Sequence, residues 1–141
     1  GVSRVLGAAE FERRYSDALN ATPQSWELTE GYYNYFMRKL RYAECVPLLQ
    51  RHLQAASTQK GFPNAYAKTR LAMTYYRLGE FEKAEQEVDG ALRHNVLTTL
   101  RAKALISDKL GQHKEAVQIA KDAAAQYVAD FRAAAIAVEL H

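Results

Sequence analysis

The chain has 141 residues, of which 48% are hydrophobic and 25% charged, and its net charge is +3 at neutral pH. It contains 24 Ala and 15 Leu but only 8 Val and 3 Ile. Because Ala and Leu favour helices and β-branched residues favour strands, this composition excludes a β-sandwich, a barrel or an alternating α/β fold. We therefore expect one all-α domain with a hydrophobic core of its own.

Other global features exclude several classes of protein. No apolar run approaches the roughly 20 residues that cross a bilayer, and the first residues lack a signal-peptide core, so we expect no membrane span and favour a cytoplasmic location. Cys45 is the single cysteine, which excludes an internal disulfide framework. The small net charge does not by itself indicate a class of partner.

Residues 1–21 predict an amphipathic helix that packs against the start of the next unit. Its apolar positions include Leu6, Phe11, Tyr15 and Leu19. The pair Thr22-Pro23 then has the form of a helix start, with a capping residue followed by proline at the first helical position. The sequence predicts that this second helix runs to about Leu40.

Three helical hairpins are expected over residues 22–127. In the second, apolar residues recur at helical spacing over residues 64–78 and again over 81–93, on either side of Gly79. Gly111 repeats Gly79 after 32 residues and marks the turn of the third hairpin. The first is a weaker copy in which Leu40 takes the glycine position. Pro47 should kink the second helix of that hairpin or delay its start.

Residues 128–141 predict a last helix, either a cap on the end of the stack or the first half of a truncated fourth repeat. A stack of repeats exposes an apolar surface at its end, and a terminal helix can cover it. Phe131 and Ile136 supply large apolar side chains in this segment.

Residues 25–126 resemble the tetratricopeptide repeat family. Its pattern of about 34 residues combines Leu-Gly, Tyr, Ala and a large apolar residue at fixed offsets in a helix-turn-helix unit. The second hairpin carries this pattern best, in Leu71-Ala72, Tyr75, Leu78-Gly79, Ala84 and Val88. It departs at Lys68 and Val96, where the family favours an aromatic residue and proline. The resemblance implies a right-handed α-solenoid of antiparallel helical hairpins.

The resemblance also implies a non-catalytic interaction scaffold that binds a peptide or a partner helix in a concave groove. Tyr, Met and Arg in such a groove suit a partner with acidic and hydrophobic side chains. Some members of the family clamp chaperone carboxylates, but Glu30 occupies one of the clamp positions and disfavours that variant. From the family's geometry we expect the groove to be lined by Asn34, Met37, Arg38, Tyr66, Met73, Tyr76, Arg77, Arg101, Leu105 and Lys109.

Candidate catalytic and metal-binding residues do not form a recognisable pattern. His52, His94, His113 and His141 include no pair at the spacing of three or four residues that a helical metal site uses. Cys45 lies seven residues before His52, close to two helical turns, but no third group follows to orient the pair. We expect Cys45 to be a packing residue, and we predict no enzyme activity, metal or cofactor.

Three other functions compete with the groove hypothesis. The chain could be an accessory domain of a larger enzyme or chaperone, for example one fused to a thioredoxin domain. It could also associate with itself as a homodimer through the exposed end of the fourth repeat. Nucleic-acid binding is disfavoured, because no single helix carries a cluster of basic residues.

Overall fold

The computed structural model describes residues 7–57, 63–92 and 97–139. Within these ranges the chain forms seven α-helices and no strand, as expected from its composition. The helices are α1 (Ala8–Ala21), α2 (Trp26–Arg38), α3 (Tyr42–Ala55), α4 (Pro63–Arg77), α5 (Phe81–Ala91), α6 (Leu97–Lys109) and α7 (His113–Glu139).

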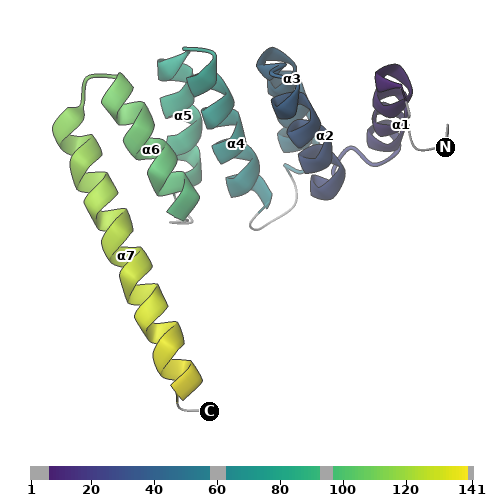
Figure 1. Ribbon diagram of the computed structural model, residues 1–141. Helices are drawn as coiled ribbons and strands as arrows, with labels where there is room; N and C mark the ends of the chain where they lie inside the picture. Colours follow the sequence, from purple (N-terminus) through teal and green to yellow (C-terminus); the bar gives the residue numbers. More distant parts are fainter. Residues whose placement is uncertain (1–6, 58–62, 93–96, 140–141) are drawn as a thin grey trace.

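The helices stand side by side in one row, from α1 at one end to α7 at the other (Figure 1). Helices α2 and α3, α4 and α5, and α6 and α7 form antiparallel hairpins, and each hairpin packs against the next. Helix α4 contacts α3, α5 and α6, so it is held between its own partner and the two neighbouring hairpins. This arrangement confirms the predicted all-α solenoid of tetratricopeptide type.

The same turn closes all three hairpins. Leu40, Gly79 and Gly111 have φ angles of 59°, 79° and 83°. The N–H of the residue after each one donates to a carbonyl five residues back, at 2.9 Å in every case. These bonds and the left-handed residue form a Schellman motif, which satisfies carbonyls that a helix end leaves without partners. The backbone of the turn is therefore repeated even where the glycine is not.

A small residue follows each turn residue by five positions. Cys45, Ala84 and Ala116 are all buried there. Two helices approach to about 8–10 Å only where the side chains between them are short, so this position permits the close packing of each hairpin. The sequence prediction that these residues are equivalent agrees with their burial.

Two local expectations for the first hairpin differ from the structure. Helix α2 begins at Trp26, where the Ser25 hydroxyl accepts a hydrogen bond from the Leu28 N–H at 3.2 Å, so Ser25 and not Thr22 is the cap. Pro47 neither ends nor delays α3, which begins at Tyr42 and continues to Ala55. Pro47 lies on an exposed part of the helix, where water can satisfy the carbonyl that loses its N–H partner.

Helix α1 is attached to α2 and to the start of α3 through aromatic and ionic contacts. The Phe11 ring lies 4.6 Å from the Tyr35 ring, and Glu12 pairs with Arg41 at 2.9 Å. A Cβ atom at Gly31 would lie 2.6 Å from the Tyr15 hydroxyl, so glycine permits Tyr15 to approach the backbone of α2. These contacts agree with the predicted role of residues 1–21 as a packing helix.

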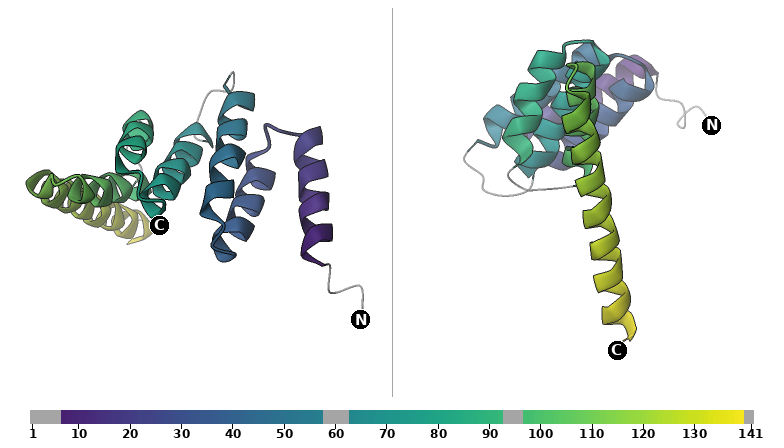
Figure 2. Two further views of the ribbon diagram at one scale, coloured as in Figure 1. Left: turned by 90° about the horizontal axis from the view of Figure 1, so that it is seen from above. Right: turned by 90° about the vertical axis from the view of Figure 1, so that its left-hand side faces the viewer.

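Helix α7 is longer than the second helices of the other hairpins. It has 27 residues, compared with 14 in α3 and 11 in α5. Its C-terminal half extends away from the other helices (Figure 1 and Figure 2, right). The boundary expected between residues 127 and 128 falls inside this one helix. No helix of the described residues is long and apolar enough to cross a membrane.

Candidate partner-binding surfaces

The contacts of α4 show how the first helix of a hairpin is oriented. The Tyr75 hydroxyl accepts a hydrogen bond from Gln50 Nε2 of α3 at 3.2 Å, so this side of α4 faces the second helices. The opposite side carries Tyr66, Met73 and Arg77, which lie on one stripe because they are separated by seven and four residues. We call this side of α4, with the equivalent sides of α2 and α6, the open face.

The open face carries one exposed cation from every hairpin. Arg38, Arg77 and Lys109 each lie two residues before the left-handed turn residue, and all three are exposed. Each also lies in the last turn of its helix, where a positive charge interacts favourably with the carbonyl end. We call these three residues the cation row.

A second row on the open face is less polar. Asn34, Met73 and Leu105 precede the cations by four residues, which is about one helical turn. Asn34 is exposed, Met73 is half-buried, and Leu105 is 46% exposed. The open face thus places apolar contact area beside the cation row at α4 and α6.

Two arginines of α4 are held by aromatic rings and an acid. The Arg77 guanidinium lies over the Tyr42 ring at 5.6 Å. Arg70 pairs with Glu30 of α2 at 3.4 Å and lies over the Tyr33 ring at 5.9 Å. The predicted groove residues did not include Arg70, although its position seven residues before Arg77 could have indicated a shared stripe. These contacts orient both guanidinium groups toward α2 and α3.

Other predicted groove residues lie at the edge of the open face. The Tyr76 ring packs edge-on against Phe81 of α5, with their centroids 5.7 Å apart. Asp108 and His113 take the equivalent positions in the third hairpin and are 2.6 Å apart. Met37 is half-buried against the hydrophobic core. In the second and third hairpins the structure therefore turns this position toward the hairpin turn rather than toward a partner.

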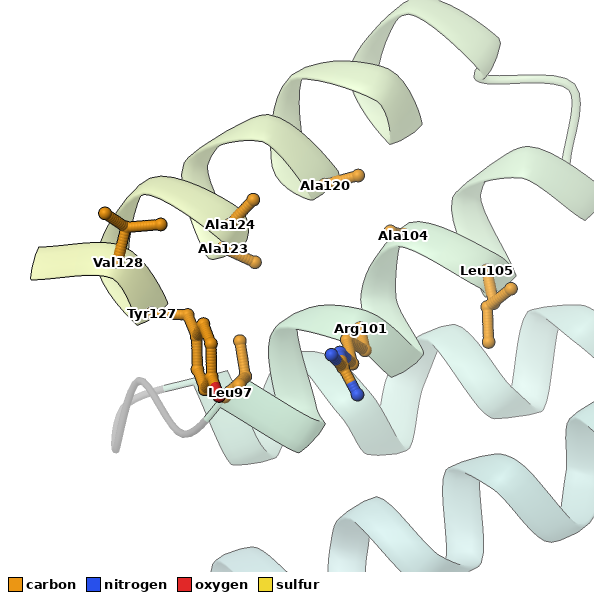
Figure 3. Close-up of a pocket in the computed structure, with 9 residues that line it drawn as sticks. All are labelled: Leu97, Arg101, Ala104, Leu105, Ala120, Ala123, Ala124, Tyr127 and Val128. Carbon is orange, nitrogen blue, oxygen red and sulfur yellow. The ribbon is translucent and has the colours of Figure 1, made fainter. Parts of the chain in front are cut away.

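A hollow of about 570 Å³ lies between α6 and α7 at the end of the row of helices (Figure 3). Alanines and larger apolar side chains from the two helices face each other across it, with Arg101 the one charged residue of its lining. Arg101 and Leu105 are predicted groove residues, and they extend the open face into this hollow. We call it the terminal hollow; its lining residues are Leu97, Arg101, Ala104, Leu105, Ala120, Ala123, Ala124, Tyr127 and Val128.

Cys45 and His52 lie in the core of the first hairpin, whereas His113 is exposed beside Asp108, and His94 and His141 lie outside the described residues. Burial raises the pKa of the Cys45 thiol to about 11, which keeps it protonated and unreactive at neutral pH. Burial lowers the pKa of His52, whose Nδ1 lies 3.5 Å from the Thr29 hydroxyl oxygen. Among the residues that the structure describes, no group of three or more His, Cys, Asp or Glu side chains could hold a metal ion.

The repeated turns, the small residues after them and the open face define a helical-repeat solenoid similar to tetratricopeptide repeats. Solved structures of MamA share this architecture. The chain superposes on the AMB-1 form of MamA with a TM-score of 0.61 and 24% identity over 82% of its length, and on a second AMB-1 structure with 0.57 and 26% over 77%. The MSR-1 form gives 0.60 and 24% over 77%.

The match to MamA covers only part of those proteins. The chain spans 62% of the length of each AMB-1 structure and 61% of the MSR-1 structure. No family model matches the sequence, and no curated protein matches it. The comparisons therefore place the chain in an architectural class, that of helical solenoids built from repeated hairpins.

Proposed function

We propose that this chain is a non-catalytic scaffold that binds an extended acidic peptide along the open face of α2, α4 and α6. The cation row is the observation that carries this proposal, because the same position of three successive hairpins presents Arg38, Arg77 and Lys109 to solvent. Arginine and lysine at such positions bind carboxylates by charge-assisted hydrogen bonds.

The spacing of the cation row suits an extended chain. Helices α4 and α6 pack directly on each other, and neighbouring packed helices are about 8–10 Å apart. An extended peptide in the polyproline II conformation advances about 3.1 Å per residue with three residues per turn, so its side chains three residues apart point the same way. Acidic side chains at that spacing would therefore meet Arg77 and Lys109. Met73 and Leu105 lie one turn away and provide apolar contacts for the residues between the acids.

Fluorescence anisotropy with labelled synthetic peptides tests this proposal. A peptide with Glu at every third position and Leu between should bind more tightly than a peptide of the same composition with its Glu residues adjacent. Replacing Arg77 and Lys109 together by alanine should weaken binding about tenfold or more, since each charge-assisted hydrogen bond contributes about 1.5–3 kcal/mol at best and less when exposed.

The matched control removes two positive charges elsewhere. Lys114 and Lys121 are exposed on α7 and lie outside the open face. If replacing both lysines by alanine weakened peptide binding as much as the loss of Arg77 and Lys109, binding would reflect net charge alone, and the proposal would be wrong. Equal affinity for the two peptides would also contradict it. Tight, strongly salt-dependent binding of duplex DNA through the same residues would indicate a nucleic-acid partner instead.

A further inference from the structure

The terminal hollow is equivalent to a surface that another helix covers in the preceding hairpin. For six of its nine lining residues, subtracting the repeat length of 32 residues gives a position on α4 or α5, and one of these six positions, Met73, is half-buried. The equivalents of Leu97, Arg101, Ala104, Ala120 and Ala123 are, in the same order, Ala65, Thr69, Ala72, Val88 and Ala91. All five are buried.

Helix α6 is the element that covers this surface on α4 and α5. The Thr99 hydroxyl of α6 forms a hydrogen bond with the Thr69 hydroxyl of α4 at 2.8 Å. Ala102 and Ile106 of α6 join Val88 in the hydrophobic core. In the last hairpin the corresponding surface remains partly exposed, since Leu105 is 46% and Val128 45% exposed. Its shape and composition therefore suit a helix with the same pattern as α6.

Residues 129–139 carry that pattern. Adding 32 to the buried residues Thr99, Ala102 and Ile106 of α6 gives positions 131, 134 and 138, which hold Phe, Ala and Val. The register also replaces one of two ion pairs by apolar residues. Lys103 pairs with Glu85 at 3.4 Å and with Asp89 at 2.8 Å. The positions 32 residues after Lys103 and Glu85 hold Ala135 and Val117, and the position equivalent to Asp89 holds Lys121. Val117 is 54% exposed and becomes a contact for the helix that fills the hollow.

These residues do not return to the hollow of their own chain. They continue α7 in a straight line away from it (Figure 2). The stretch from Ala123 to Phe131 holds neither Gly nor Pro, and its four alanines favour an unbroken helix. A fold-back would have to break α7 at strongly helical residues. A second copy can supply the same segment without any break.

We propose that two copies of this chain form a dimer by exchanging the C-terminal halves of α7, each half filling the terminal hollow of the other copy. The two α7 helices would run antiparallel about a two-fold axis near residue 126, the middle of the helix. Such an interface is isologous, because the hollow and the segment that fills it are present on both copies. The exchange supplies each copy with the first helix of a fourth repeat; it shares Leu105 with the open face but involves none of the cation row.

Sedimentation velocity over a wide range of protein concentration tests the dimer, with Ala124→Glu as the variant and Ala125→Glu as the control. Both alanines are exposed on α7, so both variants should keep their helicity. Only Ala124 lines the hollow. Burying an unpaired carboxylate should weaken the dimer about a hundredfold for Ala124→Glu and leave Ala125→Glu unchanged. A wild-type chain that stays monomeric, or a dimer that responds equally to both substitutions, would overturn the proposal.

Mixing two defective variants tests whether the exchange is reciprocal. Ala124→Glu damages the hollow but keeps an intact terminal segment, and Phe131→Asp damages the segment but keeps an intact hollow. An equimolar mixture should form heterodimers more readily than either variant forms homodimers. In the heterodimer, the intact segment of the Ala124→Glu chain meets the intact hollow of the Phe131→Asp chain, whereas in each homodimer both contacts carry a defect. A mixture no more associated than its components would show that the hollow and the segment do not meet.

Cysteine crosslinking separates exchange between copies from fold-back within one copy. Thr69 and Thr99 are in contact, and adding the repeat length of 32 residues to each gives positions 101 and 131. We therefore expect Arg101 to face Phe131 of the second copy. In a Cys45→Ala background, a mixture of Arg101→Cys and Phe131→Cys chains should give a disulfide-linked dimer, and Arg132→Cys in place of Phe131→Cys should give much less. For a chain with both Arg101→Cys and Phe131→Cys, an internal disulfide as the main product in dilute solution would demonstrate fold-back and refute the exchange.

Discussion

Leu40 occupies in the first hairpin the left-handed turn position that Gly79 occupies in the second. Their φ angles are 59° and 79°, and their N–H groups donate at 3.1 Å to the equivalent carbonyls of Met37 and Tyr76. A residue with a Cβ atom is strained in this conformation by about 1–2 kcal/mol, whereas glycine is not. The Schellman hydrogen bonds and the packing of the hairpin therefore hold Leu40 in a conformation that its own side chain disfavours.

We predict that Leu40→Gly stabilises the protein by about 0.5–1 kcal/mol, because relief of strain exceeds the entropy that glycine adds to the unfolded chain. Leu40 is 71% exposed, so little hydrophobic burial is lost. Urea denaturation measures the change. The reverse substitution, Gly79→Leu, should destabilise the second hairpin by a similar amount, and a stabilising Gly79→Leu would contradict this explanation.

Ser107 gives a second stability prediction. It takes the position of Phe36 and Tyr75 in the earlier hairpins and is buried, and its hydroxyl oxygen has no hydrogen-bond partner among the described residues. An unsatisfied buried polar group costs about 1–3 kcal/mol, so Ser107→Ala should raise the free energy of unfolding by about 1 kcal/mol. Thr99→Val is the control, because it removes the bond to Thr69 and should lower stability by about the same amount. If both substitutions raised the free energy of unfolding, or both lowered it, the buried Ser107 hydroxyl would not be an unsatisfied polar group.

The pH dependence of stability should reflect His52. Burial lowers the pKa of His52 in the folded state, so as pH falls through the ordinary histidine value of about 6.5 the unfolded chain takes up the proton first. Stability should therefore be highest above that pH and decrease between pH 7 and 5. Urea denaturation at several pH values, compared between wild type and His52→Gln, measures this contribution. The variant should show a smaller loss of stability on acidification, and an identical profile would exclude His52 as the source.

Cys45 should be unreactive in the folded protein. Its thiol is fully buried, its pKa is raised to about 11, and Sγ lies 3.8 Å from the carbonyl oxygen of Arg41. Iodoacetamide at pH 8 should modify it only as fast as the protein unfolds, and modification should become rapid in concentrated urea. Mass spectrometry measures the extent of modification with time. Rapid labelling in the absence of denaturant would show that the first hairpin opens readily.

Several features of the fold could be predicted from the sequence because they depend on local chemistry. Gly79 and Gly111 mark left-handed helix ends since glycine alone adopts that backbone freely, and the buried residue five positions later must be small for two helices to pack closely. The spacing of apolar residues then indicates which stretches pair as hairpins. Composition, helix ends and helical periodicity together determined the all-α repeat architecture.

Only the tertiary structure decided how the repeats meet and where they stop. Leu40 takes a glycine conformation because the packing of α2 on α3 requires the same turn there. Tyr76 turns toward Phe81, while Arg77 lies over Tyr42 of the neighbouring hairpin, so residues adjacent in sequence serve different surfaces. Helix α7 passes the expected repeat boundary because its alanine-rich sequence contains nothing that ends a helix. Local sequence determines each helix and turn, but contacts between distant residues determine which faces remain open to a partner.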